Sequence, residues 1–320
     1  MSIHKLILLT AITSCVVICR AQPAFTSVGG FTANTIVASS FISDAEGWVA
    51  DDGGKLWHTS NSGQQWQNIY CGVKLIAVSF TGQQDGFALT SEAAYKTNDG
   101  GISWSIIEVE NPLPPPSFSG SSNGLIRGWN VLYLTADGGT TWNTASTGDL
   151  QFTTACLLDP STIIAASLSD SAGEILWRST DGGLTWANTF SGRRYLITTL
   201  SKSSAATAWA AGYYNLAGAA HQPVILKSID GGLSWNNVYQ NVEAGGRGEG
   251  FVDIRFRNEQ EGMAITAFSE NVITTDGGQT WTLLYDTDGY GLTPLFGYYH
   301  TMSGNTNLYV CGQDGIVYRW

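Results

Sequence analysis

Short apolar segments recur along the whole chain, each separated from the next by a few polar residues or glycines. Such segments, bounded by Gly, Asn, Asp and Ser, are typical of β-strands joined by tight turns. Three landmarks repeat in a constant order: a bulky strand end, a Gly–apolar pair and a second bulky residue. The strand ends are Phe41, Phe80, Phe118, Leu157, Leu200 and Phe256, the pairs include Gly47-Trp48, Gly86-Phe87, Gly124-Leu125 and Gly262-Met263, and the second bulky residues are Trp57, Tyr95, Tyr133, Trp177, Leu226 and Val272. The order predicts an all-β chain built from one repeated unit.

Six of these units end in an eight-residue box. Five copies read Ser/Thr-x-Asp-Gly-Gly-x-Ser/Thr-Trp, and the first copy, Thr59 to Trp66, has Asn61 and Ser62 where the others have Asp and Gly. The box acids or amides are Asn61, Asp99, Asp137, Asp181, Asp230 and Asp276, and the box tryptophans are Trp66, Trp104, Trp142, Trp186, Trp235 and Trp281. Successive tryptophans are 38, 38, 44, 49 and 46 residues apart, as expected for a four-stranded sheet repeated around an axis.

The residue types in the box are those of a tight hairpin. Paired glycines adopt positive φ without steric cost, a short Asp or Asn side chain accepts hydrogen bonds from turn N–H groups, and Trp covers the hairpin with a large apolar ring. One carboxylate per unit, pointing into its own turn, cannot converge with the others on a substrate. We therefore interpret the boxes as architecture and not as catalytic or metal-binding groups.

On these residues the chain resembles the Asp-box (BNR) repeat family over nearly all of its length after residue 24. The resemblance implies a β-propeller in which each box lies at the turn between the two outer strands of a blade. A seventh unit runs from near Leu295 to Arg319 and lacks a box. We predict seven four-stranded antiparallel blades over residues 22–320, with Ala24 to Val28 supplying the last blade's missing strand and removing an open sheet edge. A six-bladed ring with an extra hairpin is the alternative.

The N-terminal segment predicts export. Lys5 precedes an apolar run from Leu6 to Ile18, and Cys19-Arg20-Ala21 follows, which resembles a signal peptide (residues 1–21) cleaved after Ala21. The run is too short and too early for a transmembrane helix, so we expect a periplasmic or secreted protein without a membrane span. The mature chain has 13 basic and 26 acidic residues, a net charge of −13. This balance argues against binding nucleic acid, whose phosphates require a cationic surface.

Cysteine and histidine give no sign of a metal or cofactor. Cys71, Cys156 and Cys311 remain after cleavage; their odd number and wide spacing exclude a zinc ribbon and a disulfide framework. We expect Cys156 and Cys311 to be buried in strands. Asp286-Thr287-Asp288-Gly289 begins like a calcium loop but lacks its later ligands, and Asp51 to Gly54 is interpreted as a hairpin turn. We expect no metal and no cofactor.

The variable loops on the face opposite the boxes are the expected place of function, because loops on a rigid scaffold usually carry binding. The long connections that enter blades 5 to 7 contain arginines and tyrosines, a combination suited to an anionic or sugar-like ligand. The alternative is that these side chains only solvate the loops. The candidate rim residues are Arg193, Arg194, Tyr195, Tyr213, Tyr214, Arg247, Glu249, Asp286, Asp288 and Tyr290.

Two functions follow from the resemblance. The many boxes and short blades are similar to the photosystem II stability/assembly factor family and its bacterial relatives, which implies an exported, monomeric, non-catalytic scaffold for a protein or glycan partner. The alternative is a sialidase-like or other glycoside hydrolase. The sialidase Arg-Ile-Pro motif is missing, since residues 22–58 contain no arginine. Glu249, Asp253, Asp286 and Asp288 are the acids that could form a catalytic pair.

Overall fold

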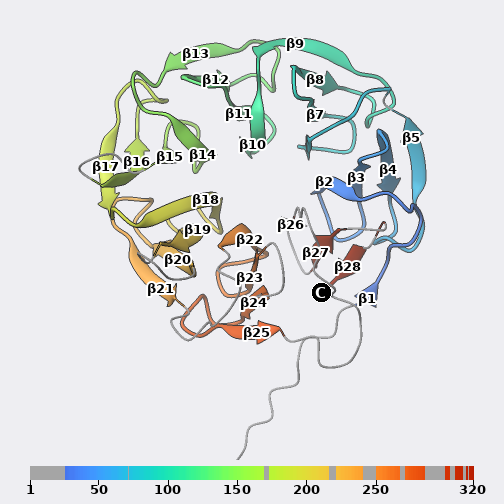
Figure 1. Ribbon diagram of the computed structural model, residues 1–320. Helices are drawn as coiled ribbons and strands as arrows, with labels where there is room; N and C mark the ends of the chain where they lie inside the picture. The colour runs from blue at the N-terminus through green and yellow to red at the C-terminus, as the bar shows by residue number, and fades with distance from the viewer. Residues whose placement is uncertain are drawn as a thin grey trace, which may run out of the picture.

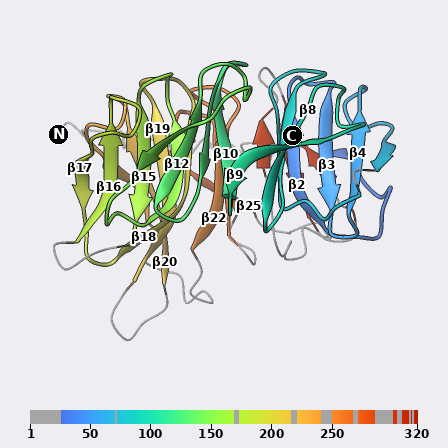
Figure 2. The ribbon, with the colours of Figure 1, turned by 90° about the horizontal axis from the view of Figure 1, so that it is seen from above.

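The protein is a seven-bladed β-propeller, as predicted. The computed structural model describes residues 26–70, 72–168, 173–215, 221–240, 250–266, 271–284, 300–302, 307–312, 315 and 317–320. The described strands form seven antiparallel sheets of four strands each, arranged around a central axis (Figure 1). Seen from the side, the ring is a disc with the strands running roughly along its axis (Figure 2). No described helix is long and apolar enough to cross a membrane.

Each blade is a simple meander from an inner strand to an outer strand. Blades 1 to 3 are β2 (Ile36–Phe41), β3 (Gly47–Asp51), β4 (Lys55–Thr59) and β5 (Gln67–Tyr70); β6 (Ala77–Phe80), β7 (Gly86–Leu89), β8 (Ala93–Thr97) and β9 (Ser105–Glu110); and β10 (Leu113–Ser119), β11 (Asn123–Arg127), β12 (Val131–Thr135) and β13 (Asn143–Ser146). Blades 4 to 6 are β14 (Phe152–Leu157), β15 (Ile163–Ser167), β16 (Glu174–Ser179) and β17 (Ala187–Ser191); β18 (Tyr195–Lys202), β19 (Ala208–Tyr214), β20 (Gln222–Ser228) and β21 (Asn236–Gln240); and β22 (Phe251–Phe256), β23 (Gly262–Thr266), β24 (Asn271–Thr274) and β25 (Thr282–Leu284).

Blade 7 is built from both ends of the chain. Its strands are β26 (His300–Met302), β27 (Leu308–Cys311), β28 (Val317–Arg319) and, outermost, β1 (Thr26–Ser27). Thr26 pairs with Arg319, and the Val28 N–H donates to the Val317 carbonyl over 2.8 Å. The predicted closure is therefore confirmed, and the six-bladed alternative is wrong.

The hydrophobic core is divided among the blade interfaces. Seven clusters of buried apolar residues are present, and each joins two neighbouring blades, including blades 7 and 1. A four-stranded sheet this small cannot bury both of its faces alone, so each blade depends on its two neighbours. The ring is thereby stabilised as one body.

An aromatic residue at the end of the inner strand stacks on the preceding blade. Phe80 of blade 2 lies on Trp48 of blade 1, with ring centroids 3.8 Å apart and 5° between the planes. Such pairs keep two large apolar surfaces out of water and add a specific ring contact. Equivalent stacked pairs are Phe41 on Tyr309, Phe118 on Phe87 and Phe256 on Trp209.

The glycine of each Gly–apolar pair makes room for that ring. Gly86 pairs with Phe80 across β6 and β7, and a Cβ at Gly86 would lie 2.6 Å from the Phe80 ring. Gly47, Gly124 and Gly262 lie against their own phenylalanines in the same way. In blade 4, where the strand ends in Leu157, its partner across the ladder is Ile163. The repeated glycine is thus explained by the repeated ring.

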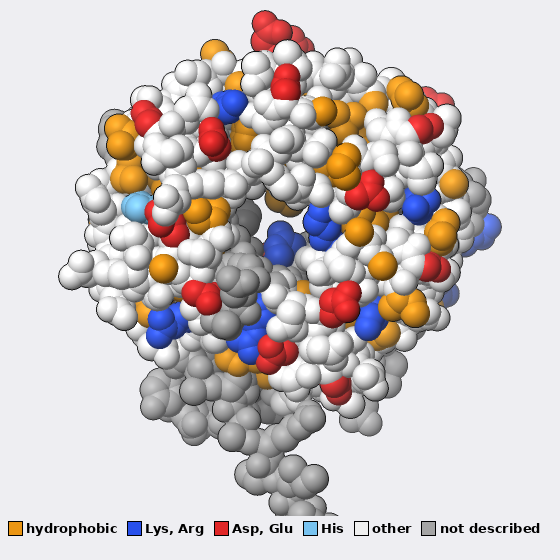
Figure 3. Space-filling view, turned by 180° about the vertical axis from the view of Figure 1, so that it is seen from behind, with side chains coloured by type: hydrophobic (Ala, Val, Ile, Leu, Met, Phe, Trp, Pro, Cys, Tyr) orange, Lys and Arg blue, Asp and Glu red, His pale blue; other side chains and the backbone are white. Residues whose placement is uncertain are grey.

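Side chains on the inner strands link successive blades around the central opening seen in Figure 3. Ser40 Oγ accepts from the Phe80 N–H over 2.8 Å, and Ser117 Oγ accepts from the Leu157 N–H over 2.9 Å. Thr153 Oγ1 donates to the Ile197 carbonyl over 3.0 Å. These bonds satisfy polar groups where the inner strands of neighbouring blades meet.

Candidate functional site

The side chains of the box acids form hydrogen bonds within their own turns. Thr97 Oγ1 donates to Asp99 Oδ1 over 2.8 Å and accepts from the Gly101 N–H over 2.9 Å. Asp99 in turn accepts from the Ser103 hydroxyl over 2.6 Å and from the Ser103 N–H over 2.9 Å. These bonds, led by that of the Ser103 hydroxyl, lower the pKa of Asp99 to about 2. The corresponding contacts are made by Asp137, Asp181, Asp230 and Asp276.

The variant first box keeps this geometry without a charge. Asn61 Oδ1 accepts from Thr59 Oγ1 over 3.1 Å and from the Gln65 N–H over 2.9 Å. Ser62, in place of the first glycine, has φ of +61°. An amide oxygen is therefore sufficient to form the turn.

Each box also contacts the rest of the ring. The Gly100 N–H donates to the Gln84 carbonyl over 2.9 Å, which joins the box to the other turn on the same face of its blade. A Cβ at Gly101 would lie 2.8 Å from Leu56 of blade 1, so the second glycine allows the box to approach the preceding blade. The box tryptophans are half-buried except for Trp235, which is buried. The boxes therefore take part in the contacts between neighbouring blades, on the face opposite the predicted rim.

On that opposite face, the structure brings part of the predicted rim together where blade 5 meets blade 4. We call Arg193, Arg194, Tyr195, Tyr213 and Tyr214 the blade 5 rim. Arg193 and Arg194 lie in the turn between β17 and β18 and are exposed. Tyr195 pairs directly with Tyr214 across β18 and β19, and their rings meet edge to face with centroids 4.9 Å apart.

Neighbouring backbone holds the two arginines at the edge of this ring pair. The Gly192 N–H donates to the Gly173 carbonyl, and the Asn215 N–H donates to the Arg194 carbonyl over 2.7 Å. Gly173 has φ of +82°, and a Cβ there would lie 2.7 Å from Arg193 Cγ, so the stem of Arg193 rests on this glycine. The turn is consequently anchored although both guanidinium groups face solvent.

The blade 5 rim carries two cations that no described acid neutralises. Among the described residues neither Arg193 nor Arg194 forms an ion pair. Three other described arginines have partners within the fold: Arg255 bonds Asp253, Arg257 bonds Glu261, and Arg127 bonds the carbonyls of Phe152 and Pro114. Burial lowers the pKa of Arg127 to about 10.

Tyr213 does not join the tyrosine pair. It points to the other face of blade 5, because successive residues of a strand alternate. The centroids of the Tyr213 and His221 rings are 4.5 Å apart, and a Cβ at Gly250 would lie 2.4 Å from the Tyr213 ring. His221 Nδ1 is buried and has no hydrogen-bond partner in the described part of the chain. The rim tyrosines therefore serve two different blade interfaces.

Phe190 completes the ring cluster on the blade 4 side and was not among the predicted rim residues. Its ring lies 5.4 Å from that of Tyr195, edge to face, and both pack against the core between blades 4 and 5. Its place in the box-following strand was readable from the sequence, but its contact with Tyr195 depends on how blade 4 meets blade 5.

Five predicted rim residues, Arg247, Glu249, Asp286, Asp288 and Tyr290, lie outside the described residues. Asp253, an acid considered for catalysis, is buried; its Oδ1 accepts from Arg255 Nη1 over 2.8 Å and from Thr199 Oγ1 over 3.2 Å. No group of three or more His, Cys, Asp or Glu side chains within the described ranges could hold a metal ion. Cys156 and Cys311 are buried free cysteines, as predicted, and Cys71 lies outside the described residues.

The turn at Asp51 to Gly54 joins β3 to β4 as predicted, but Asp51 has an additional structural role. Its buried carboxylate accepts from the Lys55 N–H and the Trp57 indole N–H, each over 3.0 Å, and from Thr32 Oγ1 over 3.0 Å. Burial acts to raise its pKa, but the hydrogen bonds outweigh burial and the pKa is lowered. The sequence shows the turn and not the distant donor at residue 32.

Comparisons with known proteins agree with this architecture. The model of the BNR/Asp-box repeat matches residues 272–283, which run from β24 into β25. No curated protein matches the chain. The chain thus contains a box that the repeat model detects, and the remaining copies are visible in the sequence itself.

Solved structures share the fold over almost the whole chain. The structure of YCF48 bound to D1 peptide is 22% identical, with a TM-score of 0.67, and the match covers 93% of this chain and 97% of that one. YCF48 from Cyanidioschyzon merolae is 18% identical, with a TM-score of 0.65 and coverage of 93% and 98%. A GH74 xyloglucanase from Xanthomonas campestris is 14% identical, with a TM-score of 0.66, and the match covers 92% of this chain and 53% of that one. Similarity at these identities shows the fold.

Proposed function

We propose that the protein is an exported, non-catalytic binding or assembly scaffold whose blade 5 rim recognises an anionic segment of a protein partner. The observation that carries this proposal is the pair of exposed arginines, unpaired among the described residues, beside the Tyr195–Tyr214 ring pair. A rigid ring that presents cations with no described ion-pair partner next to aromatic surface is suited to binding and needs no catalytic group.

The chemistry of the rim favours a carboxylate-bearing ligand. A guanidinium binds a carboxylate through two parallel hydrogen bonds, and hydrogen bonds to charged groups contribute about 1.5–3 kcal/mol each when water is excluded. At this exposed rim the contribution is smaller because water and salt screen the charges. The half-buried tyrosines add apolar contact area with little loss of side-chain freedom, since packing already restricts them.

The comparison with YCF48 supports a peptide as the ligand class. One YCF48 structure is described as bound to D1 peptide, and its fold covers almost all of this chain. The likeness to a GH74 xyloglucanase extends over only 53% of that enzyme and concerns the fold. Within the described residues, the acid considered for hydrolysis, Asp253, is bonded to Arg255. The balance of these observations favours peptide binding.

The proposal can be tested with arrays of acidic, neutral and basic peptides of equal length, printed beside neutral and sialylated glycans. The purified protein, from residue 22, should bind the acidic peptides, and binding should weaken with salt. Arg193→Gln combined with Arg194→Gln should reduce that binding roughly tenfold or more, as expected for losing two charge-assisted contacts. Lys74→Glu, an exposed change elsewhere with the same shift in net charge, should leave it nearly unchanged.

Three outcomes would overturn the proposal. Equal losses in the rim variant and in Lys74→Glu would show that net charge alone governs binding. Binding to the glycans but not to the peptides would show that the ligand is a glycan and not a peptide. Hydrolysis of fluorogenic glycosides by the wild type that is lost in Asp253→Asn would show that the protein is an enzyme and not a scaffold.

Export has its own test. Expression in the native host followed by fractionation and N-terminal sequencing should recover a mature protein outside the cytoplasm that begins at Gln22. A protein that retains residues 1–21 in the cytoplasm would contradict this part of the proposal.

A further inference from the structure

The outer strand of blade 2, β9, differs from the other described outer strands. It is six residues long, Ser105–Glu110, and reads Ser-Ile-Ile-Glu-Val-Glu, with no Lys, Pro or Gly. Three β-branched residues in six give it a strong preference for pairing in a sheet. The outer strands of blades 1, 3, 4, 5 and 6 are shorter and more polar or less β-branched: QNIY, NTAS, ANTFS, NNVYQ and TLL.

The outer edge of β9 is open among the described strands. The sheet order is β6-β7-β8-β9, so β9 is paired on one side only. The Glu110 N–H donates to Tyr133 Oη over 3.3 Å, and the register between β8 and β9 shifts between Ile107 and Glu110. The regular part of the open edge is therefore Ser105 to Ile107. An open strand edge is a ready template for another extended chain.

Side chains alternate along β9 in the manner of a half-buried strand. Ile107 and Val109 pack into the core between blades 2 and 3. Ile106, Glu108 and Glu110 are exposed, and Ile106 has 70% of its surface accessible. Natural proteins commonly protect open strand edges with charged side chains, Pro, bulges or a covering loop. In β9 the register shift and the two glutamates follow Ile107, so Ile106 lies in the part of the edge that these devices do not cover.

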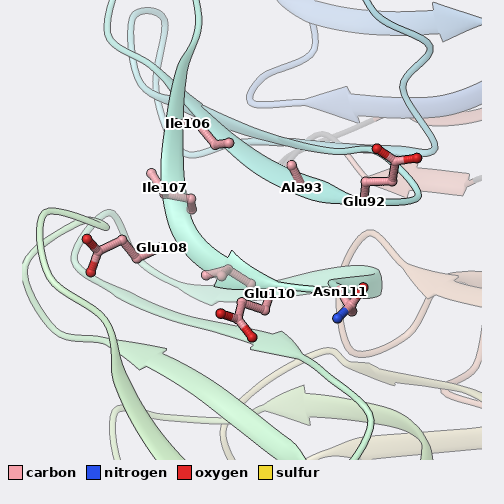
Figure 4. A pocket seen from close by; sticks show the side chains of 8 residues that line it. Glu92, Ala93, Ile106, Ile107, Glu108, Glu110 and Asn111 are labelled. Atoms are coloured by element: carbon pink, nitrogen blue, oxygen red, sulfur yellow. The ribbon is translucent and has the colours of Figure 1, made fainter.

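The exposed acids line a groove along this strand. Residues of β9 and the neighbouring turn that carries Glu92 enclose a volume of about 510 Å³ (Figure 4). Glu92, Glu108 and Glu110 are all exposed, and none forms an ion pair with a described residue. The groove, whose lining also includes Ala93 of β8, therefore combines apolar contact with negative charge that no described residue compensates.

We propose that β9 is a docking edge for an extended segment of a protein partner that carries Lys or Arg at alternate positions and adds a fifth strand to blade 2. Backbone hydrogen bonds would hold the segment, and its basic side chains would face Glu92, Glu108 and Glu110. A second copy of this chain is a poor occupant. Two β9 strands would place like charges opposite each other, and the chain as a whole has a net charge of −11.

The probe is a blocked peptide of alternating lysine and valine, labelled for fluorescence anisotropy. The full mature protein should bind this peptide and not a peptide of alternating glutamate and valine. Glu108→Lys with Glu110→Lys should weaken binding at least tenfold. The matched control is Asp149→Lys with Glu259→Lys, two exposed acids elsewhere with the same change in charge, which should alter binding by less than about twofold.

A second peptide separates strand pairing from charge attraction alone. The same lysine–valine sequence with an N-methyl group on every amide keeps every charge but has no backbone N–H with which to pair along either edge. It should lose most of the binding. Equal binding of the methylated peptide, or an equal loss in the control variant, would overturn the docking edge. A concentration-dependent dimer that is lost in the variant Glu108→Lys with Glu110→Lys would show that β9 binds a second copy of this chain and not a different protein. None of these results depends on Arg193 or Arg194.

Discussion

At the residue scale, the Asp-box is a local network of hydrogen bonds among its hydroxyl groups, its acid and its turn N–H groups. The Thr or Ser hydroxyl bonds both the second glycine and the box acid, and the acid bonds the residue before the tryptophan. Burial of an N–H without a partner costs about 1–3 kcal/mol, so the hydroxyl matters most where the glycine N–H is buried. The acid adds a charge that the native turn stabilises.

This charge predicts acid sensitivity. The pKa of Asp99, Asp137, Asp181 and Asp230 is lowered to about 2 from an ordinary value of 3.8. Because the folded-state pKa is depressed, the stabilisation is present above about pH 4 and is lost as pH falls towards 2. Melting temperatures measured from pH 5 to 2 should fall, and Asp137→Asn with Asp181→Asn should flatten that fall. Parallel curves for variant and wild type would contradict the assignment.

The buried thiols predict low reactivity. Burial raises the pKa of Cys311 to about 12 and also raises that of Cys156, so almost no thiolate forms near pH 8. In mature Cys71→Ser protein, iodoacetamide should label neither cysteine until the chain is unfolded, as read by mass spectrometry. Labelling of the native protein at Cys156 or Cys311 would show that the blade interfaces open readily.

At the element scale, the blade is the unit that repeats, and the Phe–Gly pair is what matches one blade to the next. The phenylalanine at the inner strand's end covers a glycine of its own blade and stacks on an aromatic ring of the preceding blade. Both partners were visible in the sequence as separate landmarks. Their contact was not, because the ring and its stacking partner lie in different units.

This pair predicts a coupled mutation series. Gly86→Ala should lower the free energy of unfolding by about 1–3 kcal/mol, because the new Cβ would overlap the Phe80 ring. Phe80→Leu should cost about 1–2 kcal/mol through lost packing. The double variant should cost less than the sum, since leucine opposite a larger residue already occurs at Leu157 and Ile163 of blade 4. Urea denaturation measures all three, and strict additivity would contradict the contact.

At the scale of the whole molecule, stability rests on closing the ring. The seven blade-to-blade clusters include one between blades 7 and 1, and the short strand β1 covers β28 in the last blade. Acidic and basic side chains are interspersed on the face shown in Figure 3, without one large basic patch. Because the chain has a net charge of −11, the blade 5 rim and β9 are local features of an acidic protein.

Closure predicts a specific weakness at Val28. Val28→Pro removes the N–H that donates to the Val317 carbonyl and should lower the free energy of unfolding by roughly 1–3 kcal/mol more than Val28→Ala, which keeps that N–H. Denaturant unfolding of the two variants gives the difference. Equal stability of the two proteins would mean that the shared blade contributes nothing to closure.

The sequence by itself determined the repeat, the strand order and the chemistry of the boxes, because these depend on residues that are close together in the chain. The six boxes, the resemblance to Asp-box propellers that they carry and the seventh unit without a box were sufficient to predict seven blades and the strand borrowed from the N-terminus. Tertiary structure alone decided which rim residues meet: Tyr195 with Tyr214, Phe190 beside them, and Tyr213 on the other face of blade 5. Such contacts depend on the register between strands and on the packing of neighbouring blades, and the sequence of a single repeat predicts neither of them.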